Sequence, residues 1–338
     1  MRKILVVGPS WVGDMVMAQS LFMHLKSDGD CEIDVLAPGW SLPILERMPE
    51  VRRGVVMPIG HGRLGLFTRR RLGKELAQES YGQAIVLPGS LKSALVPFFA
   101  GIPQRTGFRG EMRYGLINDM RLLDRAKLPM TVQRFVALGQ PPDAAPVSPP
   151  RPQLCADSAN QAALWERFKL DPERPAIAFM PGAEYGPAKQ WPPTHYAKLA
   201  HLLAARGFQI WVLGSEKDCA VARPIANGNP SVIDLTGRTS LGDAVDLIAL
   251  ARAAVCNDSG LMHVAAALDV PLVAIFGSSS PEHTPPLASR VVIETLRLNC
   301  APCFERHCPL GHTRCLTGIS PEKVLAGLES FGDAPLSS

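Results

Sequence analysis

The fold of the first half of this 338-residue chain is decided by residues 3–15, which read KILVVGPSWVGDM. Residues 4–7 are apolar without alternation, as in a strand that is buried on both faces, and a glycine and a proline end the strand. Over residues 15–26 apolar side chains recur every fourth position, which predicts a helix. A buried strand that passes through a glycine turn into a helix is typical of a parallel sheet covered by helices.

The same alternation of short apolar strands and helical stretches continues along the chain. We expect a helix over residues 193–206, a final helix that begins near Ser320, and strands at residues 33–36, 55–57, 84–87, 176–180, 208–213, 232–235, 253–256 and 272–276. Between the two halves, residues 140–152 contain six prolines in thirteen positions. That density excludes a helix or an interior strand and predicts a stiff linker.

The predicted fold class is therefore α/β, with two doubly wound, Rossmann-like domains that face a central cleft. We place the N-terminal domain at residues 1–140, the linker at 141–153 and the C-terminal domain at 154–338. Whether the final helix packs back on the N-terminal domain is left open. Ligands of such sheets bind at the carboxyl ends of the strands, so the loops that follow the strands are where function is expected.

The composition is that of a globular protein, with 46% hydrophobic and 20% charged residues. No apolar run approaches the roughly 18 residues that a membrane helix needs. The beginning of the chain lacks the cleavage site of a secretory signal, so we expect a cytoplasmic protein.

The net charge of +4 conceals a basic region, because residues 51–134 contain fifteen Lys/Arg and only five Asp/Glu. Such a region attracts nucleic acid, an anionic membrane surface or a phosphorylated substrate, or is merely a solvated face. Aromatic residues make up only 6% of the chain and no nucleic-acid-binding signature is present. Nucleic acid is therefore not an expected partner.

The loop after the first predicted strand, residues 8–15, carries the first candidate site. Gly13 permits a close approach of the backbone to a ligand, and the helix that follows offers free N–H groups to an anion. Asp14 either caps this helix or, at the carboxyl end of a strand, acts as a general base. The loop is not a dinucleotide fingerprint, because G-x-G-x-x-G is missing.

Two loops of the second half are suited to phosphates. Residues 180–192, MPGAEYGPAKQWP, combine glycines with Lys189, as a diphosphate site would, although an ordinary surface loop has the same composition. Residues 257–267, NDSGLMHVAAA, open a helix whose N–H groups could meet a phosphate. His263 lies about one turn after Ser259, where a lone histidine is either a ligand-binding or a structural residue.

Together these stretches resemble glycosyltransferase family 9, the ADP-heptose:lipopolysaccharide heptosyltransferases. The resemblance covers nearly the whole chain. It rests on GPSWVGD at residues 8–14, on residues 181–192, on NDSGLMH at residues 257–263, and on the block KSALVPFFAGIPQRTGFRGEMRYGL at residues 92–116.

The resemblance implies a GT-B fold that binds the acceptor on the N-terminal domain and ADP-heptose mainly on the C-terminal domain. It implies an inverting transfer of L-glycero-D-manno-heptose from ADP-heptose to the first heptose of the lipopolysaccharide inner core, or to another core position. The catalytic base would be Asp14. The donor-binding residues would be Gly13, Gly182, Glu184, Lys189, Glu216, Thr239, Asp258, Ser259, Gly260 and His263.

The acceptor implied by the resemblance is heptosyl-Kdo2-lipid A, presented at the inner face of the cytoplasmic membrane, where we expect the protein to bind peripherally. The basic region fits the acceptor's anionic groups, and the candidate contacts are Arg63, Lys92, Arg109 and Arg113. No Asp-x-Asp pair lies near the loops, so we expect no metal ion to be required for catalysis. Lys189 and the helix N-terminus would then stabilise the leaving ADP.

Four cysteines stand apart from these loops. Cys300, Cys303, Cys308 and Cys315 follow the spacing C-x2-C-x4-C-x6-C. In a cytosolic chain such a cluster favours a metal over disulfides, and we expect a closed, structural zinc site. The alternative is a surface loop of reduced thiols.

Two other functions fit the same architecture. A nucleotide-sugar epimerase would convert the donor without an acceptor, and a nucleotide-binding regulatory module would not need Asp14. The basic region favours a large anionic acceptor over both.

Overall fold

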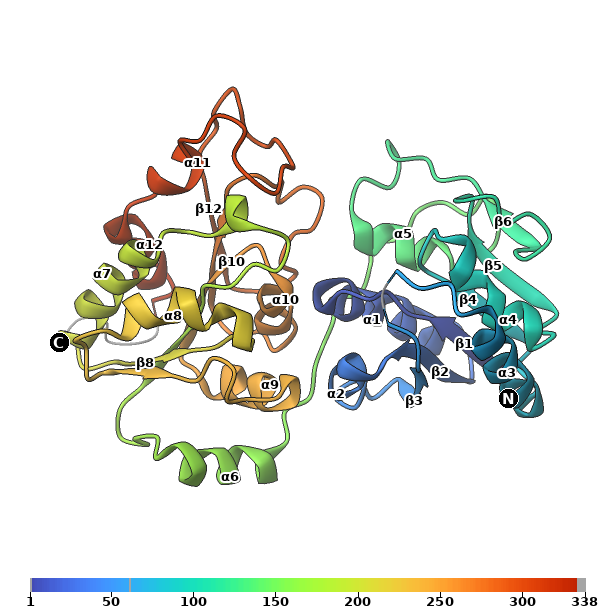
Figure 1. Ribbon diagram of the computed structural model, residues 1–338, viewed down its shortest axis with the longest axis horizontal. Helices are drawn as coiled ribbons and strands as arrows, with labels where there is room; N and C mark the ends of the chain where they lie inside the picture. The colour runs from blue at the N-terminus through green and yellow to red at the C-terminus, as the bar shows by residue number, and fades with distance from the viewer. Residues whose placement is uncertain (1, 61, 333–338) are drawn as a thin grey trace. The chain divides into compact units, whose positions relative to one another are not determined.

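A computed structural model describes residues 2–60 and 62–332, and the chain divides into two compact units, Met1–Gln153 and Leu154–Ser338. Each unit is built on one six-stranded parallel sheet with helices packed around it (Figure 1). The predicted α/β fold class with two doubly wound halves is thereby confirmed.

The first sheet has the strand order β3-β2-β1-β4-β5-β6. Its strands are β1 (Arg2–Val7), β2 (Cys31–Pro38), β3 (Val51–Met57), β4 (Gln83–Val86), β5 (Gln104–Phe108) and β6 (Asp119–Arg121). The helices of this unit are α1 (Val12–Ser27), α2 (Leu42–Leu45), α3 (Leu66–Leu76), α4 (Leu95–Phe99) and α5 (Thr131–Ala137). Residues Ile4, Leu5 and Val6 at the centre of the sheet are fully buried, as their unbroken apolar pattern predicted.

The second sheet repeats this order as β12-β11-β10-β7-β8-β9. Its strands are β7 (Ala176–Met180), β8 (Gln209–Val212), β9 (Val232–Asp234), β10 (Ala253–Asn257), β11 (Leu272–Phe276) and β12 (Val291–Thr295). The helices are α6 (Ser158–Phe168), α7 (Pro193–Ala204), α8 (Cys219–Ala226), α9 (Leu241–Leu250), α10 (Gly260–Ala267), α11 (Arg314–Thr317) and α12 (Pro321–Glu329). The final helix, α12, packs against α7, β11 and β12 of its own unit.

The strand order creates a switch point in each sheet. The chain builds outward from β1 through β2 and β3, and then returns to place β4 on the other side of β1. β7 and β10 are related in the same way in the second sheet. At such a point the connections on either side diverge, which leaves a crevice at the carboxyl ends of the two neighbouring strands.

The strands that sequence patterns missed lie toward the sheet edges. β5, β6 and β12 were not expected, because their sequences QRTGF, DMR and VVIET are short or carry polar residues. A strand toward the edge is only partly covered, so it lacks the unbroken apolar pattern that identifies a central strand.

The proline-rich stretch contains no helix or strand, but it is not a free tether. The Gln19 side chain of α1 donates to the carbonyl of Gln153 (2.6 Å) and accepts from its N–H (2.9 Å). Ser20 Oγ donates to the carbonyl of Pro150 (2.6 Å). These bonds tie the stretch along α1.

In the described part of the chain, no helix is long and apolar enough to span a bilayer.

A buried carboxylate on β2 binds two arginines of β3 and the tyrosine that precedes β4. Asp34 is fully buried, and it accepts hydrogen bonds from Arg52 (2.8 and 2.5 Å), from Arg53 (2.9 Å) and from the Tyr81 hydroxyl. Burial alone would raise the pKa of Asp34, but the hydrogen bonds from Arg52, Tyr81 and Arg53 outweigh it and lower the pKa. Two of the residues that make the region basic thus serve the fold.

Replacing Asp34 by Asn should lower the free energy of unfolding at neutral pH by about 2 kcal/mol, because two half-exposed guanidinium groups lose their carboxylate. A lowered carboxyl pKa stabilises the protein above the unfolded pKa of about 4, and this contribution is lost as the pH falls through the folded value. Urea unfolding at about pH 7 and about pH 3 should therefore show the difference shrinking at the lower pH. The matched control is Asp30→Asn, at an exposed position before β2, and equal effects of the two variants would contradict the assignment.

Candidate functional site

Side chains from three loops meet at the switch point of the second sheet. Lys189 comes from the loop after β7, Asp258 from the end of β10, and Ser279 from the loop after β11. Lys189 Nζ lies 2.5 Å from Asp258 Oδ2, and Ser279 Oγ donates to the same oxygen at 2.5 Å. Lys189 retains 17% and Asp258 only 6% of side-chain exposure. An oriented ammonium group therefore stands at the edge where ligands of such sheets bind.

A buried asparagine holds the loop after β7 in place. Asn257, the last residue of β10, donates from Nδ2 to the carbonyl of Pro181 (2.5 Å). Its Oδ1 accepts from the N–H of Trp191 (2.9 Å) and from the Tyr196 hydroxyl (3.3 Å). One amide thus binds both ends of the loop that carries Lys189. Sequence reasoning gave Asn257 no role, although a polar residue at the end of an apolar, buried strand was the available signal.

The helix that follows β10 has an open N-terminus. α10 begins at Gly260, and in the described structure the Ser259 side chain at its N-cap makes no capping hydrogen bond. By contrast, Ser240 and Ser320 cap their helices. The N–H of Met262 donates to the carbonyl of Ser259 (3.2 Å), so an anion would meet the N–H groups of Gly260 and Leu261, where the helix dipole adds positive potential.

His263 lies in the first turns of α10 and is buried. Burial lowers the pKa of its imidazole to about 4, the Asp258 carboxylate partly counteracts this, and Lys189 adds to it. The ring is therefore neutral at neutral pH and adds no charge to the cluster.

The other residues expected to bind the donor lie in loops at the same edge. Gly182 and Glu184 follow β7, Glu216 follows β8 and Thr239 follows β9. Glu184 is exposed and pairs with Lys217 (2.5 Å). Thr239 Oγ1 donates to the carbonyl of Leu235 at 3.4 Å. Within the predicted set, Lys189, Asp258, Ser259 and Gly260 lie close together at the switch point. Gly182, Glu184, Glu216 and Thr239 flank them on the side of β8 and β9.

In the first unit, Gly13 and Asp14 lie at the switch point beside β1. α1 begins at Val12, and the N-cap position is occupied by Trp11. Asp14 is the third residue of the helix and is half-buried, so it does not occupy the cap position that one interpretation gave it. The helix that carries Asp14 follows the central strand β1, and the role of Asp14 as a general base stays a prediction.

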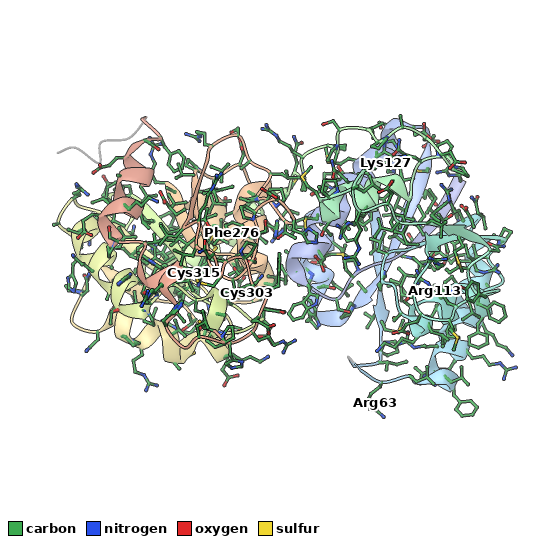
Figure 2. All side chains as sticks on the ribbon, turned by 90° about the horizontal axis from the view of Figure 1, so that it is seen from above. Arg63, Arg113, Lys127, Phe276, Cys303 and Cys315 are labelled. Atoms are coloured by element: carbon green, nitrogen blue, oxygen red, sulfur yellow. The ribbon has the colours of Figure 1, made fainter. Side chains whose placement is uncertain are left out.

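The four residues expected to contact an acceptor have different environments. Arg63 precedes α3 and is exposed at the rim of the first unit (Figure 2). Arg109 is exposed directly after β5, and Lys92 is half-buried in the short turn Leu91–Ala94 after β4. Arg63, Lys92 and Arg109 thus follow the carboxyl ends of β3, β4 and β5.

Arg113 departs from that expectation because it is fully buried. Its guanidinium donates to the carbonyls of Pro88 (2.7 Å) and Phe108 (2.5 Å), which follow β4 and end β5. A β-carbon at Gly110 would lie 2.1 Å from the carbonyl oxygen of Gly89, so the same two loops also touch through their backbones. Arg113 therefore fixes the shape of these loops and does not contact an acceptor directly.

The cysteine segment, residues 300–315, contains free thiols. Backbone N–H groups, first that of Thr313, lower the pKa of the Cys308 thiol. Burial, and then the neighbouring Cys308, Cys303 and Cys300, raise the pKa of Cys315. Across residues 2–60 and 62–332, no three His, Cys, Asp or Glu side chains are arranged to hold a metal ion. Zinc binding by these thiols stays a prediction.

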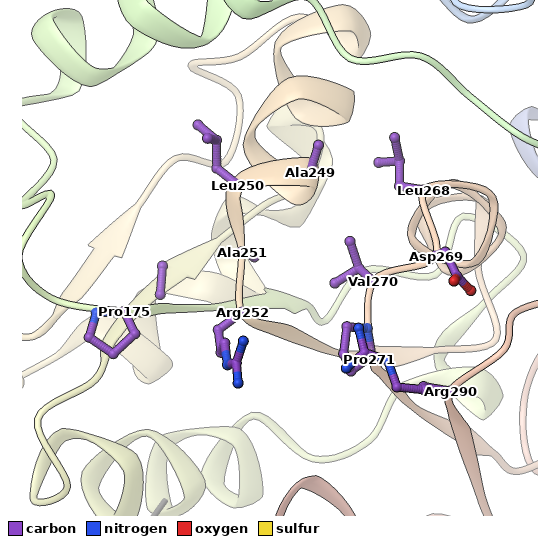
Figure 3. Close-up of a pocket in the computed structure, with 11 residues that line it drawn as sticks. Pro175, Ala249, Leu250, Ala251, Arg252, Leu268, Asp269, Val270, Pro271 and Arg290 are labelled. Atoms are coloured by element: carbon purple, nitrogen blue, oxygen red, sulfur yellow. The ribbon is translucent and has the colours of Figure 1, made fainter. Parts of the chain in front are cut away.

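A pocket of about 410 Å³ lies at the opposite edge of the second sheet (Figure 3). It is lined by residues that precede β7, β10 and β11, among them Pro175, Arg252 and Pro271. Because ligands of doubly wound sheets bind at the carboxyl edge, we do not assign the donor to this pocket.

The fold is that of a two-unit, doubly wound protein in which Lys189, Asp258 and Ser279 meet at the switch point of the second sheet. A family model for glycosyltransferase family 9 (heptosyltransferase) matches residues 69–314. Lipopolysaccharide heptosyltransferase 2 of Salmonella typhimurium is 48% identical, with 97% of this chain and 98% of the relative covered. Lipooligosaccharide heptosyltransferase 2 of Haemophilus influenzae is 49% identical, with 97% and 99% covered.

Among solved structures, ADP-heptose LPS heptosyltransferase II of E. coli superimposes with a TM-score of 0.87 at 45% identity, with 97% of this chain and 98% of that chain covered. The chain therefore belongs to glycosyltransferase family 9 and is a glycosyltransferase. The resemblance seen in the sequence motifs is confirmed.

The low pKa of His263 predicts a specific pH dependence of stability. Because the folded protein resists protonation of this ring until about pH 4, the unfolded chain binds the proton first as the pH falls below about 6.5. The free energy of unfolding of the wild type should thus fall by up to about 3 kcal/mol more than that of His263→Gln over this range. Chemical denaturation across the window measures the difference. Parallel pH profiles of the two proteins would show that the folded ring titrates normally.

Proposed function

We propose that this chain transfers L-glycero-D-manno-heptose from ADP-heptose to the first heptose of the lipopolysaccharide inner core, with inversion at the anomeric carbon. The full-length relatives named heptosyltransferase 2 support the reaction. The observation that carries the proposal is the Lys189, Asp258 and Ser279 cluster beside the open N-terminus of α10. The ammonium group of Lys189, oriented by its pair with Asp258, and the N–H groups of α10 provide hydrogen-bond donors where a nucleotide diphosphate needs them.

In this proposal the donor's diphosphate lies against the N-terminus of α10. Lys189 and the N–H groups after Ser259 neutralise its charge, and Gly260 lets the backbone approach closely. Asp258 is not a phosphate contact, because its charge would repel an anion. Its part is to orient the ammonium group of Lys189. Loops with Glu216 and Thr239 would hold the nucleoside.

The chemistry assigned to the first unit is proton abstraction by Asp14. The carboxylate takes the proton of an acceptor-heptose hydroxyl, the hydroxyl oxygen attacks the anomeric carbon, and the bond to the ADP oxygen breaks on the opposite face. The negative charge that grows on ADP is stabilised by Lys189 and the N–H groups of α10. Since these groups supply the positive charge, we propose that no metal ion is required for transfer.

The acceptor's lipid suits a second feature of the first unit. Large apolar side chains are exposed after the carboxyl ends of five of its strands, and Phe67 and Met112 reach 84% and 83% exposure. The set is Trp11, Trp40, Leu64, Leu66, Phe67, Met112, Tyr114 and Leu122. Arg63 and Arg109 lie among them in sequence. Apolar and basic side chains together favour an anionic lipid surface, so we propose that this edge contacts the inner membrane peripherally while it binds heptosyl-Kdo2-lipid A.

Transfer assays with two acceptors test the function directly. With ADP-heptose as donor, Kdo2-lipid A that already carries one heptose should be glycosylated, and Kdo2-lipid A without heptose should not. Mass spectrometry of the lipid measures the added heptose. The reverse preference would assign the chain to the first transfer. Conversion of ADP-heptose in the absence of any acceptor would instead indicate an epimerase.

Asp14→Asn should reduce turnover by roughly 10²–10⁴-fold, because the amide keeps the shape of the side chain but cannot accept the proton. Binding of ADP should remain, since the donor cluster belongs to the other unit. The matched control is Asp28→Asn at the opposite end of the same helix, where turnover should be unchanged. Near-normal turnover of Asp14→Asn would remove the base assignment and reopen the regulatory-module alternative.

A further inference from the structure

The cysteine segment is joined to the loop that carries Lys189. The N–H of Ala188 donates to the carbonyl of Arg306 (3.1 Å), and the Tyr185 hydroxyl donates to the carbonyl of Phe304 (2.7 Å). Phe304 in turn donates its N–H to the carbonyl of Ser278, beside Ser279 of the cluster (2.6 Å). The segment thus borders the donor cluster, although sequence reasoning had separated it from the ligand loops.

A glycine makes this contact sterically possible. A β-carbon at Gly186 would lie 2.5 Å from the carbonyl oxygen of Arg306, and Gly186 has a φ of +156°, which L side chains rarely adopt. Any other residue would push the two backbones apart. The close approach of the two backbones therefore depends on a glycine at position 186.

The Arg306 side chain points toward the same ring as Lys189. Its guanidinium lies 5.1 Å from the centroid of the Tyr185 ring, and Lys189 Nζ lies 5.1 Å from that centroid. The two positive charges are consequently no more than about 10 Å apart, within one Debye length at 0.1 M salt.

The two cations differ in how they are compensated. Lys189 pairs with Asp258, whereas Arg306 forms no ion pair with any residue that the structure describes, and its side chain is exposed. An unpaired guanidinium held near an ammonium group raises the local positive potential, and an anion that touches both would relieve the repulsion.

We infer that Arg306 binds the donor's diphosphate together with Lys189, and that the cysteine segment is therefore part of the donor site. This inference rests on the proposed function. A guanidinium presents parallel N–H groups that match two phosphate oxygens, which a lysine cannot do. Arg306 supplies a second protein cation for the leaving group. The Tyr185 ring fixes the direction from which that cation approaches.

Calorimetric titration with ADP tests the inference without turnover. Arg306→Gln should weaken ADP binding on the order of tenfold, and Arg306→Lys should weaken it less because the charge is kept. Raising the salt from about 0.1 M to about 0.5 M should weaken ADP binding to the wild type more than to Arg306→Gln, since one screened charge is missing from the variant. A purely structural part for Arg306 would leave that salt dependence unchanged.

Two comparisons separate this inference from the function on which it rests. Arg314→Gln alters an exposed arginine of the same segment and should bind ADP as the wild type does. Lys189→Ala should lose affinity for ADP. If Lys189→Ala loses affinity while Arg306→Gln matches Arg314→Gln, the inference about Arg306 is wrong and the donor site stands. If the wild type binds no ADP, the proposed function itself fails.

Discussion

The structure depends on one topological constraint: in a parallel sheet every strand ends at the same edge. Both sheets obey it. In both, the order in which strands are added reverses beside the first strand, between β1 and β4 and between β7 and β10. Loops that are far apart in sequence are thereby gathered at two crevices. In the second sheet Asn257 completes the arrangement, because its single amide holds both ends of the loop that carries Lys189. The loop that carries Lys189 is thus fixed to the end of a buried strand.

Positive charge in this chain serves two purposes that composition cannot separate. Within the basic region, Arg52 and Arg53 compensate Asp34, and Arg113 binds backbone carbonyls in the interior. These residues hold the strands and loops of the first sheet in position. Arg63 and Arg109 stay exposed beside apolar side chains. The surface left for an anionic acceptor is accordingly smaller than the excess of basic residues indicates.

The cluster of Lys189, Asp258 and Ser279 gathers polar groups from three loops at the edge of the second sheet. An open helix N-terminus, an ammonium group oriented by Asp258, and a neutral His263 lie together at the end of β10. The cysteine segment borders this cluster through Phe304 and Arg306. Hydrogen bonds thus join the segment to the loops that carry Lys189 and Ser279.

The sequence by itself determined the central strands and the two doubly wound halves, because unbroken apolar runs and glycine turns are local signals. It also indicated the two loops from which Lys189 and Asp258 meet. It did not reveal β5, β6 and β12, whose partial burial leaves no clear pattern. Only the tertiary structure decided that Arg113 is buried, that Asn257 clamps a loop, and that Arg306 stands beside Tyr185. Each of these depends on contacts between segments distant in sequence, and no local pattern of residues encodes which segments will meet.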